Sequence, residues 1–261
     1  MLPFSEFNPA AKVTILFIHG AFSEGAEWDL VAPRLPDYHL LLPDLPGHGK
    51  AYENRPFSKR RAAKLLAKLI TTNGHDGKAH VIGLSLGAYV AVELASQYPN
   101  VVEDMFLSGF KGMPQQMNNS IAPYAFYLEQ RFENTLPRSL TRWLMDGTDI
   151  RVTDSSRSSV QLCREVLGTP SAGDTNEQWP SAWPARTLIV AAGKAGLVPS
   201  SDSVADTVNM RDVGRKMNEE TVAYVHSEMR HPWNRQAPEL FAKTAKAWFQ
   251  REAIPTGFKE L

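Results

Sequence analysis

The sequence is poor in cysteine and has no excess of charge. Cys163 is the single cysteine among 261 residues, so an internal disulfide is impossible. Such cysteine usage fits a reducing compartment, and we expect a cytoplasmic protein. Basic and acidic residues number 28 each, and no basic block of the kind that nucleic-acid binding requires is present. We therefore expect no nucleic-acid partner.

Long apolar runs and cofactor motifs are also missing. The longest apolar runs have five to seven residues, which is too short to cross a membrane. The first twelve residues lack the basic and apolar regions of a secretory signal. The chain contains no G-x-G-x-x-G pattern and no metal-ligand spacing, so we expect no cofactor and no metal. Nothing in the sequence indicates an oligomeric state.

Apolar strands alternate with amphipathic helices along most of the chain. This alternation predicts an α/β fold, a mostly parallel sheet with helices on both faces. The strands are predicted at 13–19, 39–45, 79–84, 101–109, 187–192 and 220–227, and the helices at 27–35, 58–72, 86–98 and 237–252.

The alternation is interrupted between about residues 110 and 185, where three helical segments (121–132, 137–147 and 155–168) follow one another. We expect a core of residues 1–110 and 186–261 and a helical cap at 111–185. The cap would cover the carboxyl edge of the sheet, where ligands bind in open α/β sheets. Aromatic side chains in and near it predict an apolar small-molecule substrate with a carbonyl at the reacting end. They are Tyr124, Phe126, Tyr127, Phe132, Trp143, Trp179, Trp183 and Trp233.

A candidate nucleophile follows the strand predicted at 79–84. Residues 83–87 read G-L-S-L-G, the pattern G-x-S-x-G, between a predicted strand and a predicted helix. This context lifts the serine hydroxyl above the sheet, at the positive end of the helix. We predict that Ser85 is a nucleophile and that the N–H of Leu86 stabilises an oxyanion. The alternative is a serine in a tight turn without chemistry.

The stretch H-G-A-F at 19–22 follows the first predicted strand. Its Ala21, directly after the His-Gly pair, is in position to supply a second oxyanion N–H. We expect His19 to have a structural role, with its side chain bonded to the loop backbone.

Taken together, these motifs resemble the α/β-hydrolase superfamily, including its small esterases and hydroxynitrile lyases, and the resemblance covers nearly the whole chain except the predicted cap. It implies an α/β-hydrolase fold, with Ser85 as nucleophile and His231 as general base. It also implies that Asp44 and His48 shape a loop. The matching motifs are H-G-A-F (19–22), D-L-P-G-H-G (44–49), G-L-S-L-G (83–87) and R-H-P-W-N-R-Q-A-P-E-L-F (230–241).

The region of the predicted base leaves two alternatives open. His226, five residues before His231, is a rival base, but it falls at the end of a predicted strand. The family often has glycine before its histidine, whereas this chain has Arg230. That arginine either places a cation near the site or points to solvent.

The acid of the family pattern is missing from both of its usual positions, which hold Gly196 and Ser108. A displaced carboxylate, Asp202 or Glu228, could take its place. We favour a place at a helix N-terminus for Asp202 and a surface position for Glu228. The chain could also use a Ser–His dyad without an acid, or its site could form no acyl-enzyme on Ser85.

We therefore expect a hydrolase that acts on an ester, lactone or thioester of an apolar small molecule through Ser85 and His231. Two alternatives come from the missing acid, which normally orients the histidine. One is a lyase or cyclase on the same fold, and the other is a catalytically inactive ligand-binding protein.

Overall fold

The computed structural model describes residues 1–111, 121–133, 135–148, 150, 158–168, 180–195 and 200–261. Its strands form one sheet in the order β1-β3-β2-β4-β5-β6-β7-β8. Neighbours from β3 to β7 in this order are parallel, whereas the edge strands β1 and β8 are antiparallel to theirs. The α/β fold is thus confirmed. The bounds are β1 (Phe4–Phe7), β2 (Thr14–Ile18), β3 (His39–Pro43), β4 (Ala79–Leu84), β5 (Val102–Ser108), β6 (Arg186–Ala192), β7 (Val222–His226) and β8 (Lys259–Glu260).

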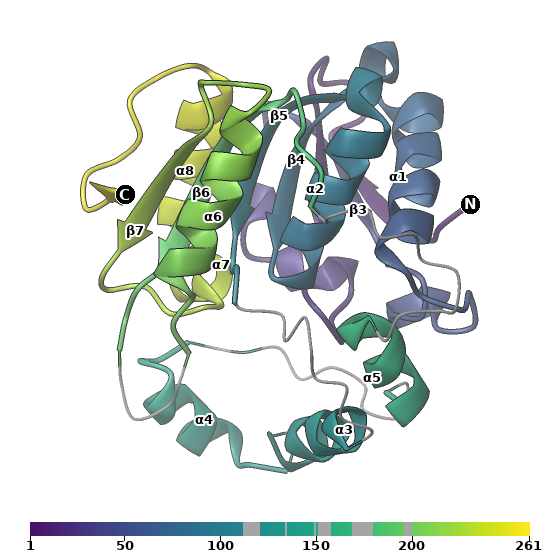
Figure 1. Cartoon of the computed structure of the whole chain (residues 1–261), viewed down its shortest axis with the longest axis vertical. Coiled ribbons are helices and arrows are strands. Elements are labelled where there is room, and N and C mark those ends of the chain that lie inside the picture. The colour runs from purple at the N-terminus through teal and green to yellow at the C-terminus, as the bar shows by residue number, and fades with distance from the viewer. Residues whose placement is uncertain (112–120, 134, 149, 151–157, 169–179, 196–199) are drawn as a thin grey trace.

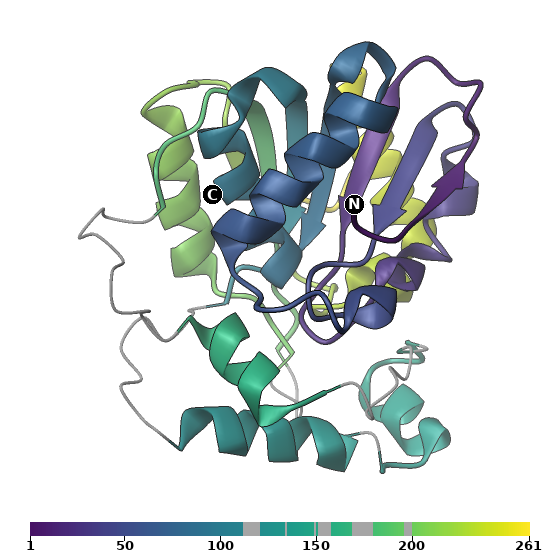
Figure 2. The ribbon, with the colours of Figure 1, turned by 90° about the vertical axis from the view of Figure 1, so that its right-hand side faces the viewer.

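Helices cover both faces of the sheet (Figures 1 and 2). On one face lie α1 (Lys59–Asn73), α2 (Leu86–Gln97) and α6 (Val204–Arg215), and on the other lie α7 (Trp233–Gln236) and α8 (Pro238–Phe249). Alternate strand residues feed two separate apolar clusters. Leu16 packs with the α1–α2 side, whereas Phe17 packs with Trp28 and Phe241 on the α8 side. Burial on both faces explains why the strands read as continuous apolar runs.

The helix predicted at 27–35 is wrong. The chain instead forms two short 3-10 turns, Gly25–Trp28 and Ala32–Arg34. Pro33 explains the break, because proline lacks an N–H and its ring clashes with the carbonyl four residues earlier. Four apolar residues of the stretch are buried in the α8-side cluster all the same, namely Trp28, Val31, Ala32 and Leu35.

We use "inserted segment" for residues 111–185, whose helices lie beyond the carboxyl ends of the strands (Figures 1 and 2). They are α3 (Ala122–Glu133), α4 (Arg138–Leu144) and α5 (Val160–Leu167). α5 is joined to the core by Glu165, whose Oε2 accepts from Phe57 N at 2.8 Å, and by a bond from Arg55 Nη1 to Ser159 Oγ at 3.0 Å. No helix in the described ranges combines the length and apolarity needed to cross a bilayer.

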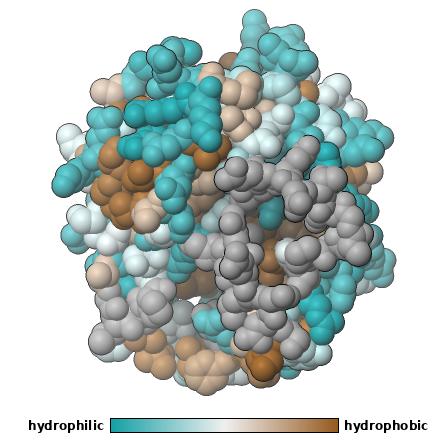
Figure 3. All heavy atoms as spheres, in the orientation of Figure 1, coloured by the Kyte–Doolittle hydropathy of each residue, from teal (hydrophilic) through white to brown (hydrophobic). Residues whose placement is uncertain are grey.

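The aromatic side chains of this region are buried, partly buried or exposed. Trp183 and Trp233 are fully buried in the core, whereas Phe132 and Trp143 are 65% and 71% exposed on α3 and α4. Figure 3 shows apolar atoms at the lower edge of the molecule, where Figure 1 places the helices of the inserted segment. Trp179 lies outside the described residues. The predicted aromatic roof is therefore divided: Tyr124 is exposed like Phe132 and Trp143, whereas Phe126 and Tyr127 pack, partly buried, against the core.

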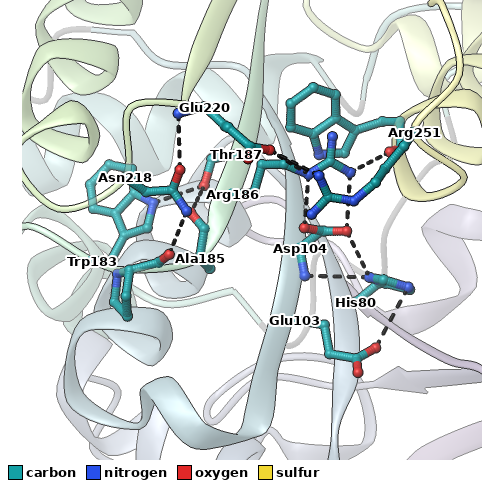
Figure 4. Close-up of polar contacts among 12 residues, drawn as sticks. His80, Glu103, Asp104, Trp183, Ala185, Arg186, Thr187, Asn218, Glu220 and Arg251 are labelled. Atoms are coloured by element: carbon teal, nitrogen blue, oxygen red, sulfur yellow. Dashed lines mark hydrogen bonds and ion pairs between the residues drawn. The ribbon is translucent and has the colours of Figure 1, made fainter.

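A cluster of charged side chains ties together the opposite, amino ends of the strands (Figure 4). Arg186 at the start of β6 donates to both carboxylate oxygens of Asp104 on β5, at 3.0 and 3.1 Å. Its guanidinium lies 3.8 Å from the centroid of the Trp248 ring on α8. His80 on β4 stacks on Phe249 and has Nδ1 3.7 Å from Asp104 Oδ2. These contacts link three central strands to α8.

Candidate active site

Ser85 lies in the turn between β4 and α2 with φ 53° and ψ −121°, backbone angles that residues other than glycine rarely adopt. Its N–H donates to Ser108 O at 2.8 Å, which fixes the turn against the end of β5. Gly87 allows α2 to approach the neighbouring strand, because a Cβ there would lie 2.1 Å from Ile18 O. The predicted strained turn is therefore present, with Ser85 partly exposed.

His231 lies beside Ser85, and Gly109 at the end of β5 makes room for both. Gly109 has φ +89°, and a Cβ built on it would lie 2.7 Å from Ser85 N and 3.0 Å from His231 Cε1. The rival histidine does not share this place: the His226 ring packs against Phe258, at 4.9 Å between centroids. The structure thus brings His231 to the serine turn.

The carboxylate of Asp202 is the partner of His231. Asp202 Oδ1 lies 2.6 Å from His231 Nδ1, and Oδ2 accepts from Ala192 N at 2.8 Å. The side chain is wholly buried. Asp202 stands at the N-terminal end of α6, as expected, but it does not cap the helix: Ser203 does, by accepting from the N–H of Asp206.

The other acid positions do not compete with Asp202 in the described structure. Glu228 is an exposed residue, as expected. Ser108 accepts from Trp233 Nε1 and donates to Val190 O, both at 2.8 Å, so its hydroxyl is used inside the core. Gly196 lies outside the described residues. The acid is therefore displaced along the β6–α6 loop.

The contact with Asp202 sets the tautomer of His231. A buried carboxylate accepts, so His231 Nδ1 carries the proton and the lone pair of Nε2 is left for another group. The backbone N–H of His231 donates to Ser200 O at 2.6 Å, which holds the residue in place. The side chain is 22% exposed. This arrangement can accept a proton at Nε2.

Of the two predicted oxyanion donors, Ala21 lies in the loop after β2, and Leu86 directly follows Ser85 as the first residue of α2. Within the described ranges, neither N–H donates a hydrogen bond to the protein. The peptide that carries the Ala21 N–H is held by His19, whose Nδ1 donates to Gly20 O at 2.7 Å while its Nε2 accepts from Leu45 N at 2.9 Å. Burial lowers the pKa of His19 to about 4, which keeps the ring neutral and suited to both roles.

Asp44 and His48 shape the loop after β3, as expected. Asp44 accepts from the N–H groups of Gly25 and Lys50, each at 2.7 Å. His48 Nδ1 bonds Pro46 O at 2.9 Å, and burial lowers the pKa of His48 to about 3. Neither side chain is engaged by His231 in the described structure.

Glu27 is a residue of the site that sequence reasoning missed. Its Oε2 accepts from Gly20 N at 2.8 Å. A Cβ built on Gly20 would lie 3.6 Å from Ser85 Cβ and 3.7 Å from Glu27 Oε2, so the carboxylate and the serine flank the same glycine. Burial raises the pKa of Glu27, against the opposing effect of the bond from Gly20. The predicted helix at 27–35 gave no signal for this contact.

The inserted segment contacts the site from two sides. Phe126 of α3 packs edge-on against Phe22, next to Ala21, at 5.3 Å between ring centroids. Asp146, just after α4, pairs with Arg230 and with Lys194, the latter at 2.9 Å.

Arg230 therefore does not point to solvent. It is buried, and its Nη1 donates to Ser200 Oγ at 2.8 Å. The hydrogen bonds from Arg230 and Lys194 lower the pKa of Asp146 to about 2, so this contact between the inserted segment and the core stays charged in mild acid.

No group of three or more His, Cys, Asp or Glu side chains in the described part of the chain is arranged to hold a metal ion. The described arrangement instead combines a strained serine, a histidine with one free ring nitrogen, a buried carboxylate and two unused N–H groups. These parts can transfer a proton from a hydroxyl and stabilise a nearby negative oxygen.

Comparison with known proteins gives a consistent picture. A sequence profile of the Alpha/beta hydrolase family matches residues 15–253. The chain is 33% identical over 264 residues to an AB hydrolase superfamily protein of Gibberella zeae, covering 98% of this chain and 86% of that protein. It is 34% identical over 101 residues to lipase LipV of Mycobacterium tuberculosis, covering 39% of this chain and 38% of the lipase. The solved structure of ALR0039 from Nostoc sp. PCC 7120 shares the fold, with a TM-score of 0.67, 14% identity, and 94% and 93% of the two chains covered.

Proposed function

The chain belongs to the α/β hydrolase family, and from this premise we propose that it hydrolyses an ester, lactone or thioester of an apolar small molecule through Ser85. The observation that carries the proposal is the 2.6 Å contact between His231 Nδ1 and Asp202 Oδ1 beside the serine turn. This contact supplies the acid that is absent from the usual positions, and it completes a nucleophile, base and acid in the chain order Ser, Asp, His.

In the proposed acylation, Ser85 Oγ attacks the acyl carbon while His231 Nε2 accepts the hydroxyl proton. Asp202 keeps Nδ1 protonated and stabilises the imidazolium that forms. The carbonyl π electrons move to oxygen, and the N–H groups of Ala21 and Leu86 stabilise that oxyanion. When the tetrahedral intermediate collapses, the bond to the leaving group breaks, and the proton on Nε2 passes to the leaving oxygen or sulfur.

In the proposed deacylation, the same groups act on water. His231 Nε2 takes a proton from a water molecule, whose oxygen attacks the acyl carbon of the Ser85 ester. Collapse of the second intermediate releases the carboxylic acid, and the proton returns to Ser85 Oγ. The chain's own residues therefore supply every proton transfer in both halves of the reaction.

The surroundings of the site support an apolar acyl or alcohol group. Phe22 directly follows the proposed oxyanion donor Ala21, and Phe126 of the inserted segment packs on it. We propose that the inserted segment acts as a cap, which contacts the site on the oxyanion side through Phe126 and on the base side through Asp146. A substrate bound between these contacts would meet aromatic surface next to the reacting carbonyl.

The contact of Asp202 also bears on the alternatives. The case for a lyase, a cyclase or an inactive binding protein depends on a histidine with no acid to orient it. With Asp202 in place, that reason no longer favours them over hydrolysis. The lipase relative, although matched over a minor part of its length, is consistent with an ester substrate.

The proposal is tested with a fluorophosphonate probe and a series of p-nitrophenyl esters of increasing acyl length. We expect covalent labelling of the wild type, and loss of labelling and turnover in Ser85→Ala. Ser96→Ala is the matched control, because Ser96 lies at the other end of α2 and its hydroxyl bonds Glu93 O. Ester turnover that persists in Ser85→Ala, or labelling confined to another serine, would contradict the proposed function.

A further inference from the structure

We propose that Glu27 is a positioning residue of the oxyanion loop, by which we mean residues 19–22, and that it acts by accepting the hydrogen bond from Gly20 N. This inference rests on the proposed function, because it assigns Ala21 N–H to the oxyanion. Glu27 is none of the proposed nucleophile, base and acid, and the role proposed for it is carried through the backbone of Gly20.

Gly20 is held at both ends by side chains, the buried His19 and the partly buried Glu27. Its N–H donates to Glu27 Oε2 at 2.8 Å, and its carbonyl accepts from His19 Nδ1 at 2.7 Å. The peptide that contains this carbonyl also contains the Ala21 N–H, so its orientation sets where that N–H points. His19 holds the peptide plane between Gly20 and Ala21 through the Gly20 carbonyl. Glu27 holds the N–H of Gly20 and so restricts rotation of that plane about the Gly20 backbone.

The site leaves little else to hold the Gly20 amide. Gly20 has no side chain that could lock its backbone, and it is buried, so an N–H without an acceptor there would be unsatisfied. A Cβ on Gly20 would make ordinary contacts with Ser85 Cβ and both Glu27 oxygens, at 3.6 to 3.8 Å. The carboxylate and the nucleophilic serine thus both lie next to Gly20.

Glu27 is itself held in place. It lies in the 3-10 turn Gly25–Trp28, whose first residue donates to Asp44 Oδ1 at 2.7 Å, and Trp28 is fully buried next to it. Arg235 Nη1 donates to the backbone carbonyl of Glu27 at 3.0 Å. The acceptor is therefore mounted on a rigid element, as a positioning group requires.

An oxyanion donor acts on charge that develops only in the transition state, so a loosened donor lowers kcat more than it raises KM. We expect Glu27→Ala to lower kcat about tenfold to a hundredfold with KM changed less than about threefold. Glu27→Gln keeps a carbonyl oxygen for Gly20 N–H, so kcat should return to within about threefold of the wild type.

Glu239→Ala is the control, since Glu239 is an exposed acid on α8 that pairs with Lys243, four residues further along the same helix, at 2.8 Å. Its kcat should change by less than about twofold. Rates are referred to the concentration of sites titrated by the phosphonate, so that loss of folded protein is not counted as loss of catalysis.

A second readout does not depend on turnover. Hydrogen exchange of the peptide that contains Gly20 and Ala21 should be faster in Glu27→Ala than in the wild type and unchanged in Glu27→Gln. If Glu27→Ala leaves both exchange and kcat unchanged, or if Glu27→Gln is as impaired as Glu27→Ala, the positioning role is wrong. If exchange is faster in Glu27→Ala and unchanged in Glu27→Gln but Ser85→Ala retains turnover, Glu27 does hold the Gly20 amide and the proposed hydrolase function is wrong.

Discussion

Each end of the sheet places a histidine close to an aspartate, yet the two pairs differ in which of their polar atoms other groups already bind. At the carboxyl end, His231 and Asp202 are 2.6 Å apart, and the carboxylate's other oxygen is occupied only by a backbone N–H. At the amino end, His80 and Asp104 are 3.7 Å apart, and Arg186 takes both carboxylate oxygens (Figure 4).

The difference shows what separates a reactive pair from a structural one. The Asp104 carboxylate is paired with the Arg186 guanidinium, and both His80 ring nitrogens have partners: Nδ1 accepts from Asp104 N at 3.3 Å and Nε2 lies 3.6 Å from Glu103 Oε2. Asp202 faces no arginine in the described structure, and its histidine is partly exposed next to a strained serine. The two residue types are the same in both pairs. What distinguishes the pairs is the group besides the histidine that binds each carboxylate, a backbone N–H at Asp202 and a guanidinium at Asp104.

The largest effect that we predict comes from Asp202→Asn. Asparagine cannot accept from both His231 Nδ1–H and Ala192 N–H with one oxygen, and its NH₂ favours the wrong tautomer. We expect kcat to fall about 10⁴-fold, as in other triads, with steady-state kinetics on an activated ester as the measurement. Glu228→Gln is the control and should leave kcat unchanged. Full activity in Asp202→Asn would show that the His231–Asp202 pair is no more reactive than the structural pair at the amino end of the sheet.

The second prediction concerns the amino end. Arg186→Met leaves Asp104 buried without its guanidinium and removes the contact with the Trp248 ring. We expect the free energy of unfolding to fall by about 3–5 kcal/mol in urea titrations while kcat per labelled site stays unchanged. Arg251→Ala, which removes an exposed ion pair with Glu220, should cost less than about 1 kcal/mol. A large loss of kcat in Arg186→Met would mean that the two ends are coupled.

The third prediction is a pH dependence of stability that originates mostly at the carboxyl end. His19 has a pKa of about 4 in the folded chain and near 6.5 when unfolded, so between these values only the unfolded chain binds the proton. The free energy of unfolding therefore falls as the pH is lowered from 6.5 to 4, and His19 should contribute about 3 kcal/mol to that fall.

The comparison of variants sharpens this prediction. Burial also lowers the pKa of His80, but the charges of Asp104 and Glu103 oppose the shift. Urea titrations across this pH range should show that His19→Gln removes more of the pH dependence than His80→Gln does. The reverse order would place the acid-sensitive element at the amino end.

The smallest effect is expected from Gly196→Asp, which puts an acid at the family's usual position. Because His231 Nδ1 is already bonded to Asp202, a second carboxylate has no vacant partner, and kcat should rise by less than about threefold. The same substitution in the Asp202→Asn background measures whether the usual position can serve as a substitute. A large gain in the otherwise wild-type chain would show that Asp202 does not fill the role proposed for it.

Local pattern was sufficient for much of the fold and for the serine turn. The apolar runs predicted the six parallel strands because both faces of such strands are buried, and G-x-S-x-G predicted the turn because glycine is needed at 87 for close approach to β2. The helix at 27–35 failed because a single proline outweighed a favourable apolar spacing. The edge strands β1 and β8 were missed because they are short and carry no apolar pattern.

The partners of the site were beyond sequence reasoning because they depend on distances between residues far apart in the chain. The sequence favoured a place at a helix N-terminus for Asp202, because aspartate is a common residue there. Only the folded chain brings its carboxylate to His231, which lies 29 residues further along. Glu27 and Gly109 likewise acquire their places through strands that meet at one sheet edge. The sequence by itself determined the order of elements, the strained turn and the kinds of side chain available to the site. The tertiary structure decided which carboxylate is left unpaired by arginine and which histidine faces the serine, because burial and contact are properties of the packed chain.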